Sequence, residues 1–156
     1  MNATNPSHRQ MSTVLLRRNL VNLFCNLEEP EKTEFKNILL NQYINEKVLP
    51  IQRGIANLIG ILLPVVELKN WPELQSLLDQ ALQSDPHSIA TFVLLNCLLY
   101  HFKAPQQLNN YLFNALKVPN LVDEAIKCVT AVAETQEIDQ TLAIELIKLW
   151  EQSNWP

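Results

Sequence analysis

The sequence predicts an all-α protein built from antiparallel helix pairs that stack in a row. Hydrophobic residues recur at intervals of three and four along almost the whole chain, which is the period of an amphipathic helix. Glycine, which sheet proteins use in tight turns, occurs only 2 times, whereas most of the 9 prolines fall at or just before an expected helix start. The expected connections are short, about 2–6 residues, so successive helices must fold back on one another.

Four helices are expected in the first half of the chain. Their approximate bounds are 7–24, 31–45, 51–67 and 71–83, and their apolar stripes include Leu20, Leu39, Ile55 and Leu74. The third helix should kink or end near Pro64, because proline removes a helical hydrogen bond. Asn70 can cap the fourth helix, with Glu73 three residues later at the capping-box position.

Four further helices are expected in the second half. Their approximate bounds are 87–102, 106–116, 121–134 and 138–152, and their stripes include Leu95, Leu112, Val129 and Leu146. The fifth helix is apolar nearly all round, which predicts burial between neighbours. Asp85 and Asn120 are the expected caps of the fifth and seventh helices, and acidic residues follow Asn120 near the positive end of the helix dipole.

The helices group into pairs that start near residues 30, 71, 104 and 138, after a tail over 1–6 and an unpaired first helix over 7–24. The spacings of about 41, 33 and 34 residues fit HEAT units of 40–47 residues or tetratricopeptide units of 34. The tetratricopeptide signature of small and aromatic residues is absent. We therefore expect residues 7–156 to form an α-α superhelix, a HEAT/armadillo-type solenoid of seven to eight helices.

Both ends of this array are expected to be open. The first helix lacks a partner before it, and the tripeptide Asn-Trp-Pro that opens the fourth helix recurs at 154–156. An uncapped solenoid end exposes an apolar face. The pattern indicates a segment of a longer array or a shortened relative of one, and it predicts self-association through the open ends.

Composition excludes several classes of function. The net charge of −4 and a pI of about 5.3 give no general attraction to nucleic acid or to an anionic membrane. The longest apolar stretches, 55–63 and 89–99, are too short to span a bilayer, and the polar N-terminus is not a signal peptide. Three scattered histidines suggest no metal site, and no cofactor is expected.

The three cysteines carry no recognisable chemistry. Cys25, Cys97 and Cys128 lie in apolar helical patterns without a CxxC spacing, which predicts reduced, buried thiols in an intracellular protein. Cys97 and His101 lie four apart on one helix, but an inert thiol is expected in so apolar a setting. No phosphate-binding glycine loop, HExxH or GxSxG motif occurs, so the chain is not expected to be an enzyme. A helical-domain enzyme is a minor alternative, which turnover destroyed by Cys97→Ser would support.

Several motifs of the first half resemble importin-β-type nuclear transport receptors. Residues 5–20 read NPSHRQMSTVLLRRNL, similar to the second helix of the first repeat in that family, with its Asn/Asp-Pro turn, Arg-Gln pair and Leu-Arg-Arg-x-Leu. Residues 33–44 resemble the next outer helix, followed by an inner helix from Ile51. The run Trp71-Pro72-Glu73-Leu74 resembles the opening of the third repeat. The closest likeness is to receptors that carry histones and ribosomal proteins, and from Pro86 onward it is only to helical repeats in general.

This resemblance implies a superhelix whose second helices line a concave face. It implies binding of the GTP-loaded small GTPase Ran and of basic cargo proteins, with nucleoporins as further partners, and a location in cytoplasm and nucleus. The chain has about three and a half repeat units, far fewer than a whole receptor, so complete transport activity is not expected of this segment alone. The alternative function is a HEAT-repeat adaptor that recruits another protein without transport activity.

The first helix carries three candidate contact residues. Arg9, Arg17 and Arg18 give it a basic face that would suit an acidic patch of Ran or of another partner. The alternative is a solvated face whose arginines pair with Glu28, Glu29 or the next helix, as exposed charges commonly do.

Other candidates have equally plain alternatives. Arg53 and Asn57 lie on the polar side of the third helix and would line the concave surface, with simple solvation as the alternative. Trp71 is expected in the core rather than at a docking site, whereas Trp155 is a candidate exposed contact. Core or inter-repeat packing is expected for four further aromatic residues, Phe92, Tyr100, Phe102 and Phe113.

Overall fold

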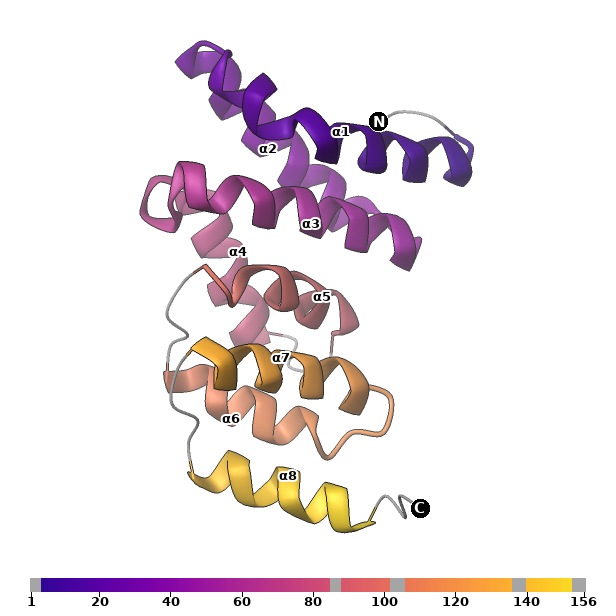
Figure 1. The fold of residues 1–156 in the computed structure, drawn as a ribbon, viewed down its shortest axis with the longest axis vertical. Helices are drawn as coiled ribbons and strands as arrows, with labels where there is room; N and C mark the ends of the chain where they lie inside the picture. The colour runs from indigo at the N-terminus through magenta and orange to yellow at the C-terminus, as the bar shows by residue number, and fades with distance from the viewer. Residues whose placement is uncertain (1–3, 85–87, 102–105, 136–139, 153–156) are drawn as a thin grey trace. The chain divides into compact units, whose positions relative to one another are not determined.

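The computed structural model describes residues 4–84, 88–101, 106–135 and 140–152 (Figure 1). Within these ranges the chain forms α-helices and one short 3₁₀ helix, η1, with no strand, which confirms the all-α prediction. The helices are α1 (Pro6–Cys25), α2 (Glu29–Asn45), α3 (Leu49–Val66), η1 (Leu68–Asn70), α4 (Pro72–Ser84), α5 (Ile89–Leu98), α6 (Gln106–Ala115), α7 (Val122–Thr135) and α8 (Gln140–Gln152). Contacts divide the chain into two compact units, residues 1–78 and 79–156, and the boundary falls inside α4.

In the first unit, α3 is the central helix and packs against both α1 and α2 (Figure 1). Its apolar residues form most of the core, together with Leu20 and Phe24 of α1 and Leu39 of α2. The α1–α3 contact is close because Gly54 of α3 faces Thr13 of α1. A Cβ atom at Gly54 would lie 2.5 Å from the Thr13 hydroxyl oxygen.

The first two helices begin with side-chain caps. The Asn5 side-chain oxygen accepts a hydrogen bond from the Ser7 N–H at 2.9 Å at the start of α1. Glu28 and Glu31 form a capping box at the start of α2, in which the Glu31 carboxylate accepts the Glu28 N–H at 2.8 Å. Proline occupies the first turn of α1, α2 and α3, where its missing N–H has no helical partner.

The end of α3 differs in detail from the prediction. The helix ends at Val66, two residues after Pro64, and Glu67 then adopts a positive φ of 61°. The 3₁₀ helix η1 follows, which the sequence pattern did not indicate. Asn70 lies in η1, and its side-chain amide donates to the Val66 carbonyl at 3.1 Å, so the expected cap of α4 is wrong. Trp71 directly precedes α4, and its carbonyl accepts the N–H groups of Leu74 and Gln75.

In the second unit, α5 packs against α7, while α6 packs against α7 and α8. Six of the ten residues of α5 are buried, as its apolar surface predicted, although the helix is shorter than expected and ends at Leu98. Leu121, and not the expected cap Asn120, directly precedes α7. The Leu121 carbonyl accepts the Ala125 N–H at 2.8 Å. The expected cap Asp85 lies outside the described residues.

Within each unit, helices two apart in sequence lie side by side, as α1 and α3 do, and the intervening helix packs on one of them. Stacked helix pairs would give contacts of this kind, and the superhelix itself stays a prediction. Among the described helices, α3 alone is long and apolar enough to cross a membrane by length and composition, contrary to the expectation that every apolar stretch is too short. Core helices pass the same test, and α3 buries eight of its residues inside the first unit.

Candidate protein-binding face of α1 and α3

The predicted contact residues of α1 do not share one face. Arg9 and Arg18 are nine residues apart, and a helix turns by about 100° per residue, so they lie on opposite sides of α1. Arg9 lies on the side of the buried residues Thr13 and Leu20, whereas Arg18 lies on the exposed side. The single basic face expected from the sequence is therefore divided between an inner and an outer surface.

Arg9 fixes α1 to the connection between α2 and α3. Its Nε and Nη2 atoms donate to the two carboxylate oxygens of Glu46, at 3.0 and 3.2 Å. The Glu46 carboxylate also accepts the N–H groups of Lys47 and Val48, at 3.0 and 2.9 Å. Glu46 ends α2 and its side chain is only 8% exposed, so this pair joins three helices. For Arg9, the structure therefore agrees with the alternative prediction, an ion pair with the next helix, through the residue that directly follows α2.

The electrostatics of Glu46 follow from these contacts. Burial by itself would raise the pKa of the carboxyl group, because it disfavours the charged form. The Val48 N–H, the Arg9 guanidinium and the Lys47 N–H each oppose this effect, and together they hold the pKa below its ordinary value. Glu46 is therefore ionised at neutral pH and acts as a structural anion.

Arg17 and Arg18 are exposed, and neither makes a hydrogen bond or ion pair with any other residue that the structure describes. On α3, Arg53 is half-buried and Asn57 is exposed. Both helices belong to the first unit and pack together. The proposed role of these side chains in contacts with a partner remains a prediction.

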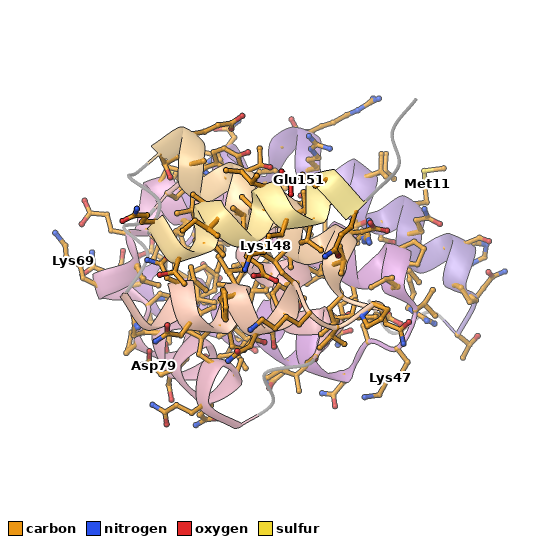
Figure 2. All side chains as sticks on the ribbon, turned by 90° about the horizontal axis from the view of Figure 1, so that it is seen from below. Met11, Lys47, Lys69, Asp79, Lys148 and Glu151 are labelled. Atoms are coloured by element: carbon orange, nitrogen blue, oxygen red, sulfur yellow. The ribbon has the colours of Figure 1, made fainter. Side chains whose placement is uncertain are left out.

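The outward side of α1 also exposes large apolar side chains, which sequence reasoning did not single out. Met11 and Leu15 are each 58% exposed and Val14 is 49% exposed. Figure 2 shows the Met11 side chain extending away from the ribbon. We name the residues Met11, Val14, Arg18, Val21 and Cys25 the outer seam of α1, because their spacing places them in one row on the helix. Leu15 lies beside this row.

A groove of about 500 Å³ lies where the C-terminal ends of α1 and α3 meet α2. Its lining combines apolar groups with lysines and consists of Phe24, Cys25, Glu29, Lys32, Lys36, Val65, Val66 and Asn70. Lys32 pairs with Glu29 at 2.8 Å, and Lys36 donates to the Asn70 carbonyl at 3.1 Å. Each ammonium group has three donors, so both lysines keep hydrogen-bonding capacity toward a ligand in the groove.

The aromatic residues follow the predictions in part. Trp71 is fully buried, as predicted, and its indole N–H has no acceptor among the described residues. Phe92 is buried against Tyr111, with ring centroids 5.0 Å apart. Tyr100, by contrast, is 52% exposed and donates its hydroxyl to Glu134 of α7 at 3.0 Å, so of the two expected settings, core and inter-repeat packing, the core is wrong for this residue. The half-buried Phe113 stacks under the Lys117 ammonium group, while Phe102 and Trp155 lie outside the described residues.

The cysteines differ from one another. Cys128 is buried, and this burial, with the nearby Glu124 carboxylate, raises the pKa of its thiol far above the ordinary value, which makes it inert. Cys97 is half-buried. Cys25 is exposed, because it occupies the outward side of α1, so the prediction of a buried thiol is wrong there.

Among the residues that the structure describes, no group of three or more His, Cys, Asp or Glu side chains is placed to hold a metal ion. The surface features of the first unit are the outer seam, the two exposed arginines and the groove. No family model matches the chain, and no curated protein or solved structure matches it either.

Proposed function

We propose that this chain is a protein-binding helical-repeat module of the importin-β type, a segment or shortened relative of a nuclear transport receptor. In this proposal it forms a HEAT-type solenoid and binds GTP-loaded Ran, basic cargo or both in nucleocytoplasmic transport. The resemblance of residues 5–20 and 71–74 to the early repeats of those receptors is the reason for naming this family.

One observation carries the broader part of the proposal. The outward side of α1 combines exposed aliphatic side chains with an exposed arginine that lacks a partner among the described residues. Contiguous exposed apolar surface with polar neighbours is typical of protein-interaction sites. The packing of α1 on α3 holds this surface on a rigid element, as recognition requires.

The transport function is tested by calorimetric titration of this chain with Ran at moderate salt, with Ran loaded either with GTP or with GDP. The proposal predicts clear binding to the GTP form and weak or no binding to the GDP form. The variant Arg18→Glu should weaken that binding at least about tenfold if α1 faces an acidic patch of the GTPase. Equal binding of both nucleotide forms would contradict the transport reading, because a receptor of this class must distinguish them.

A HEAT-type adaptor without transport activity is the second candidate. It is favoured by the exposed aliphatic side chains on the outward side of α1, which suit a protein partner of any pathway. Absence of Ran binding, together with capture of a different purified partner that depends on α1, would support the adaptor over the receptor.

A further inference from the structure

The outer seam of α1 has the spacing of a coiled-coil seam. Its residues follow one another at intervals of three, four, three and four, from Met11 through Val14, Arg18 and Val21 to Cys25. This is the alternation of a and d positions in a heptad repeat, which places one row of side chains against a facing helix. The row is about 21 Å long at 1.5 Å per residue, which matches a partner helix of about three to four turns or more.

The seam is exposed along this length. Met11, Val14 and Val21 are 58%, 49% and 38% exposed, although their aliphatic side chains would be favourable to bury. The opposite side of the same helix contacts α3 through Thr13 and Gly54, and it contacts the connection between α2 and α3 through the Arg9–Glu46 pair. A further helix can therefore be added on the outward side without displacing a described contact of α1.

The charge of α1 restricts what can cover the seam. The helix contains three arginines and no acidic residue, although the whole chain carries a net charge of −4. Arg18 stands at the middle of the seam, two steps from Met11 and two from Cys25. In a two-fold pair of identical seams, parallel or antiparallel, Arg18 would face the Arg18 of the other copy. Like charges at that position disfavour a second copy, whereas a carboxylate on a different helix would pair with Arg18.

The groove gives the seam a direction. Cys25 belongs to both, so the C-terminal end of the seam opens beside Lys32 and Lys36. Glu29 also lines the groove and pairs with Lys32, so the positive charge that a helix on the seam meets at this end is mainly that of Lys36. The C-terminus of a helix carries partial negative charge, and acidic side chains there would reach the same lysines.

We propose that the outer seam of α1 is a docking site for an acidic amphipathic helix of another protein. This helix contributes aliphatic residues against Met11, Val14 and Val21, a carboxylate opposite Arg18, and an acidic end beside the groove. The inference deepens the proposed protein-binding function and rests on it, because it names the class of partner that α1 takes.

Selection from a displayed library of helical peptides tests this site. Peptides of about three heptads, with acidic, basic and apolar residues varied, are selected on the whole chain at about 0.15 M salt. We expect enriched peptides to have apolar residues at heptad spacing and a central Asp or Glu. Enrichment of basic or extended peptides, or failure to enrich any helix, would overturn the proposal.

Matched charge reversals locate the contact. Binding of a selected synthetic peptide should fall at least about tenfold on Arg18→Glu, and a central Glu→Arg change in the peptide should restore it. Arg17→Glu makes the same change in charge about 100° away around the helix and should alter binding by no more than about twofold. Equal losses in both variants would show attraction to net charge only and would refute a seam contact.

Further readouts test the direction of the bound helix and distinguish the other possible occupants of the seam. A peptide with an activated C-terminal cysteine should form a mixed disulfide with Cys25 faster than a peptide with its cysteine at the N-terminus, and the reverse order would refute the direction. Binding to phosphatidylserine-containing vesicles that Met11→Asp abolishes would assign the seam to a membrane. A dimer in ultracentrifugation that Val14→Glu abolishes would assign it to a second copy. If Ran-GTP binding is unchanged in Arg18→Glu, the proposed transport function is supported and Ran does not contact the seam.

Discussion

Gly54 allows α1 and α3 to pack closely, and its replacement by alanine should destabilise the first unit. On an isolated helix Gly→Ala stabilises by about 1 kcal/mol, because alanine has the higher helix propensity. Here the new methyl group would lie 2.5 Å from Oγ1, 3.0 Å from Cβ and 3.2 Å from Cγ2 of Thr13. The first of these separations is too short for a methyl carbon against a hydroxyl oxygen, so the two helices or the Thr13 side chain must move.

The Thr13 side chain cannot move freely. Its hydroxyl donates to the Gln10 carbonyl at 2.8 Å, and the residue is only 4% exposed. Rotation about χ1 would break this hydrogen bond, which is worth about 1 kcal/mol, and β-branched residues have few alternative rotamers in a helix. Overpacking of this kind costs about 1–3 kcal/mol. After subtraction of the propensity gain, we expect Gly54→Ala to lower the free energy of unfolding by about 1 kcal/mol.

Urea unfolding followed by far-UV circular dichroism and tryptophan fluorescence measures the effect. In a background with Trp150→Phe and Trp155→Phe, the buried Trp71 reports on the first unit alone. Gly54→Ala should be less destabilising in the presence of Thr13→Ala, which removes Oγ1 and Cγ2, with a coupling energy of about 1 kcal/mol. A Gly54→Ala variant that is about 1 kcal/mol more stable than the parent, with no coupling to Thr13, would refute the close approach of α1 and α3.

Three other changes test the remaining local features. Glu46→Gln should cost about 2 kcal/mol at pH 7 by breaking the half-buried pair with Arg9. The pKa of Glu46 is lowered in the folded protein, so the stability difference between the two proteins should be complete at a pH above the ordinary carboxyl pKa. It should vanish as the pH falls through the lowered pKa of the folded protein, which acid titration of both proteins would show. Glu67→Gly should stabilise by about 1 kcal/mol in thermal unfolding, because φ is 61° there, and an unchanged melting temperature would contradict the strained backbone. Maleimide should modify Cys25 in the native protein well before Cys128, and equal rates would contradict their burial.

The sequence predicted what depends on local patterns. Periodicity placed every helix to within a few residues, and proline marked the starts of α1 to α4 because its effect on the first turn is local. It failed at Asn70, where a competing local contact decides, and at Tyr100, where a distant partner decides. Asn70 matches a capping pattern, yet η1 forms and its amide turns to Val66. Tyr100 looks like a core residue, but Glu134, far along the chain, holds its hydroxyl at the surface.

The positions of the arginines on α1 could be predicted from the sequence only in part. Helical geometry alone puts Arg9 and Arg18 on opposite sides, so their separation could have been derived from the sequence. Which side is buried could not, because that depends on α3 and on the position of Glu46. The exposed outer seam has the same origin. Its heptad spacing is visible in the sequence, but a buried core helix has the same spacing. Only the packing of α1 shows that this row is exposed.

The two sides of α1 should therefore separate stability from binding. On the inner side, Gly54, Thr13 and the Arg9–Glu46 pair fix the helix in place, so its outer seam is presented on an element that is already ordered. A partner helix would lose less free energy to ordering than it would on a mobile segment. Arg9→Met should consequently lower the free energy of unfolding and leave the affinity of a seam peptide nearly unchanged under native conditions. Arg18→Glu should leave the free energy of unfolding nearly unchanged and weaken binding of the seam peptide. The reason is that Arg18 touches no charged residue that the structure describes, so only a bound partner would experience the reversal of its charge.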